Sequence, residues 1–101
     1  MGETRVQLCG RIALTWHGER VESLLPARQG RLLFAYLVVH RARAIRRDEL
    51  IDALWGDGAP AAADGTLRSL LSRLRRVLGA EALPSGDPPA LHLPDDAFVD
   101  L

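Results

Sequence analysis

The chain of 101 residues lacks most of the features that mark specialised classes of protein. Its one cysteine, Cys9, can form no disulfide within the chain and suits a reducing compartment. Cys9 falls in an apolar strand pattern, and we interpret it as a small core residue. The longest apolar run, Leu32 to Val39, is too short to cross a bilayer. No charged and then apolar leader stands at the N-terminus, so we expect a cytoplasmic protein without membrane contact.

Residues suited to catalysis or metal binding are also scarce. His17, His40 and His92 are scattered, with no partner at the spacing of a metal site. Asp95 and Asp96 are adjacent, but nothing near them offers a base, a nucleophile or a cradle for a substrate. We therefore expect no enzymatic activity, no metal and no cofactor.

Lysine is absent, so all 13 basic residues are arginine, and 13 acidic residues balance them. The zero net charge argues against a nonspecific polyanion binder, yet it hides alternating blocks. Residues 28–47 hold six arginines and no acid, whereas 48–64 hold five acids and no arginine. Residues 65–80 then hold four arginines, and 81–101 hold five acids. The basic surface should therefore be local.

The stretch at 64–79, DGTLRSLLSRLRRVLG, has two faces on a helical wheel of about 100° per residue. Its apolar arc is formed by Leu67, Leu70, Leu71, Leu74, Val77 and Leu78. The rest of the wheel carries Arg68, Ser69, Ser72, Arg73, Arg75 and Arg76. No acid lies between Gly65 and Ala80, so we expect four unopposed guanidiniums, which suit phosphate oxygens and the guanine edge. The pattern predicts a helix packed on a core by one face and presented to nucleic acid by the other; the alternative is an ordinary solvated basic face.

The remaining elements follow from changes of period. Residues 4–9 and 11–16 alternate like strands, His17-Gly18 suits a two-residue hairpin turn, and a third short strand is expected near 20–22. A continuous apolar stretch predicts a central, buried helix at about 28–41.

Residues 47–56 predict a short helix with Gly56 at its end. Trp55 lies on the apolar face of this helix, so we expect it in the core; the alternative is an exposed aromatic that takes part in recognition. Pro60 suits the first turn of the next helix, at about 60–79. Trp16, at a strand end, could cover the core or contact a partner.

This order of elements predicts an α+β fold, a winged helix-turn-helix with an N-terminal antiparallel sheet, three helices and a C-terminal β-hairpin. We expect one domain over 1–101, with strands in 1–25, helices in 26–79, a wing hairpin in 80–94 and the start of a linker in 95–101. The expected function is sequence-specific binding of double-stranded DNA, with the helix at 60–79 in the major groove. The alternative is a winged helix that binds protein instead, because its acidic and basic blocks could mate with another chain.

Longer motifs carry a family resemblance. RQGRLLFAYL (28–37), RRDELIDALW (46–55), the Pro60 connector and TLRSLLSRLRRVLG (66–79) resemble the DNA-binding domain of actinobacterial SARP/BTAD-type regulators, an OmpR/PhoB-type winged helix. VQLCGRIALTWHG (6–18) fits the leading strands of that family. In the family a helical BTAD module begins near a motif like that at 98–101.

The resemblance implies roles for individual residues. Positions that face the groove correspond to Arg68, Ser69, Ser72 and Arg73, and Thr66 opens the same motif. Arg75 and Arg76 should meet phosphates, and Arg47, at a helix start, should hold a phosphate with backbone N–H groups. The full set of expected DNA contacts is Arg47, Thr66, Arg68, Ser69, Ser72, Arg73, Arg75 and Arg76.

Two departures from the family pattern concern the wing and a helix cap. The family's wing carries basic residues and a Gly-Tyr, whereas residues 88–96 contain no arginine and end in Asp95-Asp96. An acidic wing should avoid the negative potential of a minor groove. Arg46 stands where the family often has a serine cap, which costs about 1 kcal/mol or exchanges the cap for a phosphate contact.

The resemblance also implies partners. In OmpR-type relatives the loop before the recognition helix faces RNA polymerase, so we expect protein contacts at Asp57 and Asp64. Tandem, head-to-tail placement on direct repeats would set Asp95 and Asp96 against a neighbour's arginines. Bound to DNA in this way, the protein would associate with the nucleoid.

Overall fold

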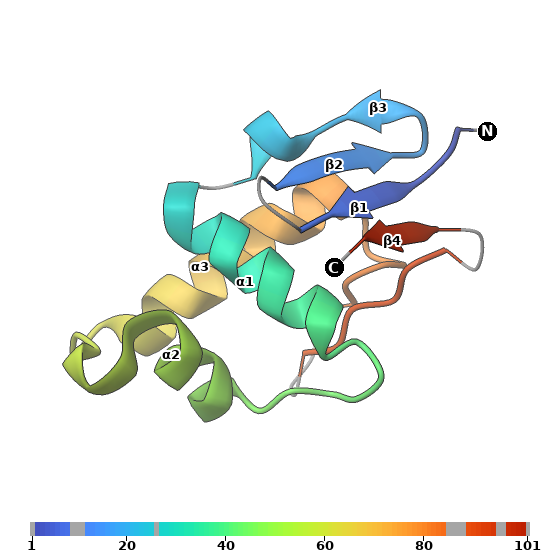
Figure 1. Cartoon of the computed structure of the whole chain (residues 1–101). Coiled ribbons are helices and arrows are strands. Elements are labelled where there is room, and N and C mark those ends of the chain that lie inside the picture. The colour runs from blue at the N-terminus through green and yellow to red at the C-terminus, as the bar shows by residue number, and fades with distance from the viewer. Residues whose placement is uncertain (1, 9–11, 26, 85–88, 95–96, 101) are drawn as a thin grey trace.

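The two ends of the chain meet in one sheet (Figure 1). The computed structural model describes residues 2–8, 12–25, 27–84, 89–94 and 97–100. Among these, the strands are β1 (Arg5–Gln7), β2 (Ala13–Trp16), β3 (Glu19–Arg20) and β4 (Phe98–Asp100), in the spatial order β3-β2-β1-β4. β2 is antiparallel to both β1 and β3, as expected, while β4 runs parallel to β1.

The turn between β2 and β3 is the one expected at His17-Gly18. Both residues have positive φ angles, 50° and 90°, which a two-residue turn that matches the twist of its strands requires. The Gly18 N–H donates to the carbonyl of Glu3 at 2.8 Å, so the turn is also fastened to the start of the chain. The prediction of a hairpin is confirmed.

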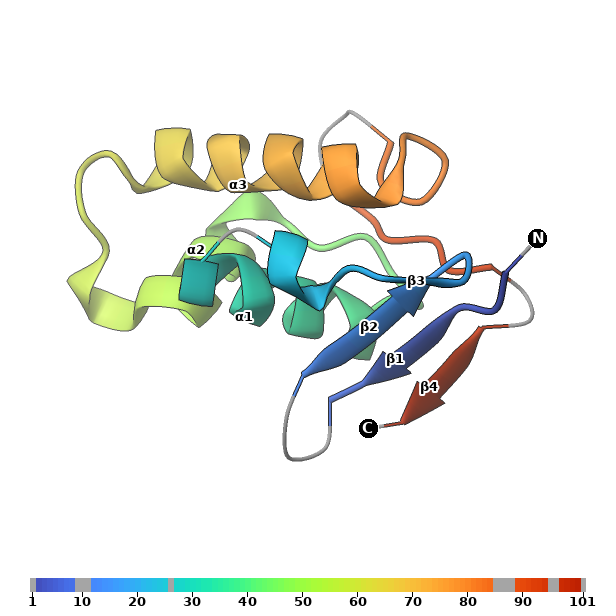
Figure 2. The same ribbon diagram turned by 90° about the horizontal axis from the view of Figure 1, so that it is seen from above.

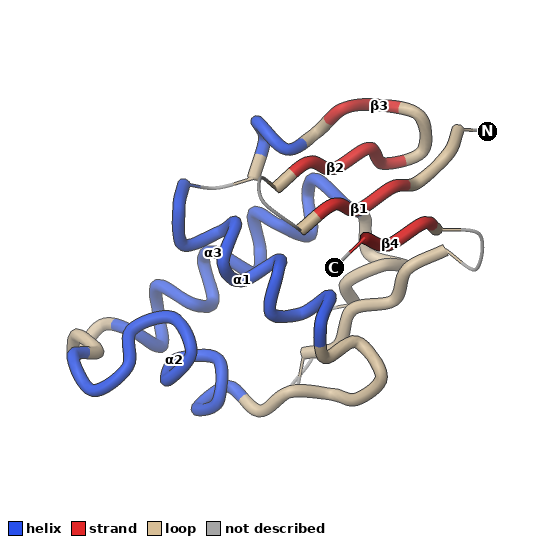
Figure 3. Tube along the Cα trace, viewed as in Figure 1, coloured by secondary structure: helices blue, strands red, loops and turns tan. Residues whose placement is uncertain are grey.

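The described residues form three α-helices, which lie to one side of the sheet (Figures 2 and 3). They are α1 (Ala27–Val39), α2 (Arg47–Trp55) and α3 (Ala63–Leu78), and two single 3-10 turns, η1 (Glu22–Leu24) and η2 (Gly56–Gly58), precede α1 and follow α2. Gly56 ends α2 with a φ of 62°, a positive value that glycine adopts readily, so the glycine expected at this helix end is confirmed. The predicted α+β winged-helix fold is confirmed.

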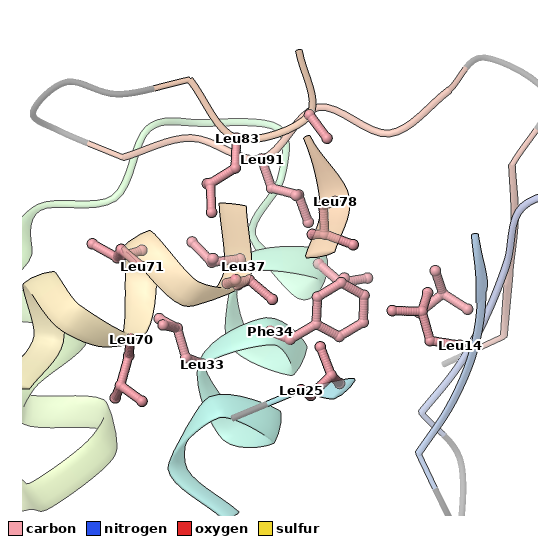
Figure 4. Packing of buried hydrophobic residues seen from close by; sticks show 14 of the residues in the cluster. Leu14, Leu25, Leu33, Phe34, Leu37, Leu70, Leu71, Leu78, Leu83 and Leu91 are labelled. Atoms are coloured by element: carbon pink, nitrogen blue, oxygen red, sulfur yellow. The ribbon is translucent and has the colours of Figure 1, made fainter. Parts of the chain in front are cut away.

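One apolar core joins the sheet, α1 and α3. In Figure 4, Leu14 of β2 points toward Phe34 of α1, and Leu78 of α3 lies beside that ring. Phe34 and Leu14 are fully buried, and each such side chain contributes about 1.5–3 kcal/mol when removed from water. The predicted apolar arc of α3 is buried except for Val77, which packs against the edge of the core.

The central helix is less enclosed than its composition suggested. Leu33, Phe34 and Leu37 of α1 are buried, but Leu32 and Val39 are 43% and 52% exposed. α2 and α3 contact α1, and Leu14 of the sheet points toward its Phe34, so only one face of the helix is covered. Its opposite face is therefore solvent-exposed.

The C-terminal segment differs in detail from the predicted hairpin. The described residues of 80–94 contain no strand; instead, the His92 N–H donates to the Ala82 carbonyl at 2.7 Å, and Leu83 and Leu91 enter the core. The strand at this end is β4, within the segment expected to begin a linker. Apolar side chains thus fasten the arms of this loop, the wing loop (80–94), to the core, and strand pairing passes to 98–100.

Two smaller expectations were wrong in position. Pro60 lies before α3 rather than in its first turn, and its carbonyl accepts the Ala63 N–H at 3.0 Å. Trp55 is half-buried at the edge of the core instead of inside it, since α2 ends at this residue. Cys9 lies outside the described residues. Across the part of the chain that the structure describes, every helix is too short or too polar for a bilayer span.

Candidate nucleic-acid interface

α3 presents a polar face to solvent along its whole length. Figure 2 shows the helix at one edge of the molecule, with the other helices on a single side of it. The outward positions are all exposed: Arg68, Ser69, Ser72, Arg73 and Arg76. Thr66, near the start, is partly buried. The two faces separate as the wheel predicted because the apolar residues recur with the helical period.

Two arginines on this face have their charge available. Among the described residues, the side chains of Arg73 and Arg76 form no ion pair or hydrogen bond. They lie three residues apart, so they are neighbours on the helix surface. Ser69 and Ser72 beside them are short, which leaves room for a ligand to approach the backbone.

Arg68 and Arg47 share one acidic partner. Asp64, in the first turn of α3, accepts two bonds at Oδ1 from Arg47, from Nε at 3.0 Å and from Nη2 at 2.6 Å. The same Nη2 donates to the Asp64 carbonyl at 3.1 Å. Oδ2 of Asp64 lies 3.7 Å from the Arg68 guanidinium. Arg47 therefore joins the start of α2 to the start of α3.

Arg75 is directed into the protein. Its Nε donates to the Leu83 carbonyl at 2.7 Å, and its Nη2 reaches the Pro84 carbonyl at 3.5 Å. The expectation of four unopposed guanidiniums on α3 is therefore wrong for two of them. Arg68 has the acid Asp64 one turn before it, and Arg75 is bonded to the wing loop.

The C-terminal end of α3 is anchored to the sheet. The indole N–H of Trp16 donates to the Leu78 carbonyl at 3.0 Å, and Trp16 is only 6% exposed. This bond satisfies one of the carbonyls that a helix end leaves unpaired. Of the two roles open to Trp16, the structure places it in the core.

The other predicted site residues are more dispersed. Asp57 is exposed in η2, and Asp95 and Asp96 lie outside the described residues. Arg46 stands at the N-cap of α2 without a side-chain capping bond, as its residue type implied. Its Nη2 lies 3.3 Å from Oδ2 of Asp48, which is in the first turn of α2.

A polar cluster between α1 and α2 was not foreseen from the sequence. The Arg43 guanidinium donates two hydrogen bonds to the Glu49 carboxylate, from Nη1 at 3.0 Å and from Nη2 at 2.6 Å. The Tyr36 hydroxyl donates to the same carboxylate. The bonds from Arg43, and then that from Tyr36, lower the pKa of Glu49 to about 2. The same hydrogen bond raises the pKa of Tyr36. These residues share no sequence period, and they meet because α1 packs against α2 and the connection between the two helices carries Arg43.

Metal chemistry finds no support in the part of the chain that is described. No three histidine, cysteine, aspartate or glutamate side chains gather there in a way that could hold an ion. The arrangement on α3 is suited to a polyanion, since free guanidiniums lie beside small hydroxyls on its exposed face.

Comparison with known proteins places this geometry in a family. Residues 22–86 match the family model described as "Transcriptional regulatory protein, C terminal". The chain is 40% identical over 70 residues to the regulatory protein AfsR of Streptomyces griseus. The aligned region covers 69% of this chain and 7% of AfsR. It is 33% identical over 96 residues to the transcriptional regulatory protein EmbR of Mycobacterium tuberculosis, spanning 88% of this chain and 24% of EmbR.

A solved structure agrees with the sequence comparisons. Mycobacterium tuberculosis EmbR in complex with a low-affinity phosphopeptide superposes with a TM-score of 0.81 at 30% identity, over 96% of this chain and 27% of that one. The chain thus spans about a quarter or less of these relatives. The resemblance to SARP-type regulators with an OmpR/PhoB-type domain is confirmed.

Proposed function

Because the chain belongs to the family of C-terminal domains of transcriptional regulatory proteins, the DNA-binding domain of OmpR/PhoB-type regulators, we propose that it binds duplex DNA sequence-specifically, with α3 in the major groove. Domains of this family regulate transcription and are not enzymes. DNA is therefore the partner to which the proposal assigns α3.

One observation carries the proposal: α3 is buried along one face and exposes unpaired arginines beside small serines along the other. An α-helix fits the major groove of B-DNA, where a forked guanidinium can read the O6 and N7 atoms of guanine. Arg68, Ser69, Ser72 and Arg73 lie centrally on this face, with Thr66 at its start. We assign base contacts to these positions and a phosphate contact to Arg76, near the C-terminal end.

Engagement inside the protein removes some residues from the proposed DNA contacts. Arg75 is bonded to the wing loop and Arg47 to Asp64, so we count neither as a phosphate ligand of the free domain. The described residues of the wing loop include no arginine. Affinity should then depend mainly on α3.

A modest affinity for one copy favours paired sites. Nonspecific binding by such modules lies at roughly 10⁻⁴–10⁻⁶ M at physiological salt. Two copies placed head-to-tail on direct repeats would gain apparent affinity through linkage, and the protein would then be found with the nucleoid. We further propose that Asp57, which is exposed on η2, faces RNA polymerase.

The test is selection of duplexes from a random library, followed by gel shifts at several salt concentrations. We expect Arg73→Ala to cost about 1–3 kcal/mol on the selected duplex and to relax preference at one position. Arg76→Ala should weaken selected and random duplexes alike and reduce the salt slope by about one.

The same experiment addresses the protein-binding alternative. If the wild-type chain binds no duplex even at low salt, the proposed function is wrong. A winged helix that binds protein then becomes the favoured function. If both arginine variants weaken random DNA equally and leave preference intact, DNA binding stands but the roles assigned on α3 are wrong.

A further inference from the structure

The ion pair between Arg47 and Asp64 occupies the junction of the two helices that form the helix-turn-helix. Arg47 is the first residue of α2, and Asp64 is the second residue of α3. Three contacts of 2.6–3.1 Å join them, two to a carboxylate oxygen and one to the backbone of α3 itself. A guanidinium that bonds both the side chain and the carbonyl of one residue restricts direction as well as distance.

Burial of Leu67 packs the second turn of α3 on the core, but few other contacts orient its first turn. All residues from Gly56 to Ala62 are exposed, and two of the first three are glycine. Neither helix has a side-chain capping bond at its start, since Arg46 and Ala62 stand at the N-caps. Ala63 is buried, but its single methyl group gives a small packing contact. The pair therefore supplies the specific polar contact at this end, as Arg75 and Trp16 do at the other.

The low exposure of Arg47 supports a structural role for the pair. The Arg47 side chain is only 22% exposed, whereas its partner Asp64 is 57% exposed and Arg68 is 76% exposed. An isolated, fully exposed ion pair contributes little, but a bidentate arginine that is mostly shielded from water loses less to screening and to side-chain entropy. Oδ2 of Asp64 lies 3.7 Å from Nη2 of Arg68. The same carboxylate therefore also influences the position of Arg68, to which we assigned a base contact.

We propose that Arg47 and Asp64 are positioning residues for sequence recognition: their ion pair sets how the first turn of α3, with Thr66 and Arg68, meets the groove. This inference rests on the proposed function and assigns both residues a role other than DNA or polymerase contact. It makes a prediction against simple electrostatics. Removing the acid Asp64 should harm recognition of DNA, although it removes negative charge from the DNA-binding side.

The test is a double-mutant cycle with Arg47→Met, Asp64→Ala and the double variant, each bound to a selected duplex and to a random one. Methionine keeps the apolar stem of Arg47 and removes its charge. The specificity ratio should fall about tenfold in either single variant and no further in the double variant, because paired groups couple by this order. Affinity for random DNA should not fall in Asp64→Ala.

Matched controls are available on the same molecule. Asp52→Ala removes an exposed acid of α2 that has no side-chain partner among the described residues, and Arg31→Met does the same for an exposed arginine of α1. Both should leave the specificity ratio unchanged. Circular dichroism melts verify folding. If Asp64→Ala does not fold, Asp64→Asn takes its place; because it keeps an oxygen acceptor at this site, its specificity ratio should fall by less than tenfold.

Three outcomes would overturn the inference. If Arg47→Met weakens both duplexes equally and reduces the salt slope by about one, Arg47 is a phosphate ligand. If Asp64→Ala tightens binding to both duplexes equally, Asp64 only repels DNA. If the wild-type chain binds no duplex, the proposed function fails together with the inference; in the first two cases DNA binding stands and the positioning role alone is lost.

Discussion

At the residue scale, the two tryptophans occupy contrasting environments. Trp16 is buried and donates its indole N–H to the last residue of α3, while Trp55 is half-buried at the end of α2 with no side-chain hydrogen bond among the described residues. A buried carbonyl that loses its donor retains the cost of its desolvation. The two residues should therefore respond differently to the same substitution.

We expect Trp16→Phe to lower the free energy of unfolding by about 1–3 kcal/mol, from the lost bond and the lost volume. Urea unfolding followed by far-UV circular dichroism measures this in both variants. Trp55→Phe is the matched control and should cost clearly less. Equal costs would mean that the bond to Leu78 contributes nothing measurable.

The Tyr36–Arg43–Glu49 cluster makes stability depend on pH. The pKa of Glu49 is lowered from 4.5 to about 2, so its stabilising effect is complete above pH 4.5 and is lost as the pH falls toward 2. Glu49→Gln should therefore be less stable than wild type at pH 6, with the difference shrinking as the pH falls to 2.5.

Urea midpoints at several pH values measure the effect of Glu49→Gln. Asp52→Asn, on the same helix but without such partners, is the control. A difference between wild type and Glu49→Gln that stays constant with pH would show that the carboxylate is not preferentially bound in the folded state.

At the element scale, the helices were the more predictable part of the fold. The apolar period of α3 and Gly56 at the end of α2 are local signals, and both were confirmed by the structure. The pairing of β4 with β1 joins residues more than 90 positions apart, and nothing in a three-residue strand announces its partner. The candidate site divides in the same way. The exposed face of α3 follows from periodicity, whereas the contacts of Arg47 and Arg75 depend on how the loops run.

Gly56 offers a test of element boundaries. An added Cβ would meet nothing within 4 Å at Gly56 or at Gly58, but only Gly56 has a positive φ. Gly56→Ala should therefore destabilise the fold by about 1–2 kcal/mol, while Gly58→Ala should be neutral or slightly stabilising. Thermal melts of the two variants compare these effects, and equal melting temperatures would contradict the boundary assigned to α2.

At the scale of the whole molecule, β4 makes the C-terminal residues part of the domain. Its central residue, Val99, pairs in register with Val6 and packs against the core, whereas Phe98 is 55% exposed. We expect Val99→Asp to lower the free energy of unfolding by about 1–3 kcal/mol, because it places a charge against apolar side chains. Phe98→Ser, on the outer face, should cost less.

Chemical denaturation of both variants checks this, and an unaffected Val99→Asp would show that residues 98–100 behave as a linker. The expected division of 1–101 into strands, helices, a wing and the start of a linker stays a prediction, as does the junction with a following BTAD module.

The parallel pairing of β1 and β4 also has a mechanical consequence. The chain enters the sheet at the Arg5 end of β1 and leaves it at the Asp100 end of β4, and these points lie at opposite ends of the strand pair because the two strands run in the same direction. Backbone bonds from Leu8 to Asp100 and from Phe98 to Thr4, of 2.8 and 2.9 Å, mark the two limits of the pairing. Tension between the two termini would load these bonds together, in shear, rather than one after another. A pulling force applied through flanking polypeptide would therefore be resisted by the β1–β4 pairing before the force reached α3.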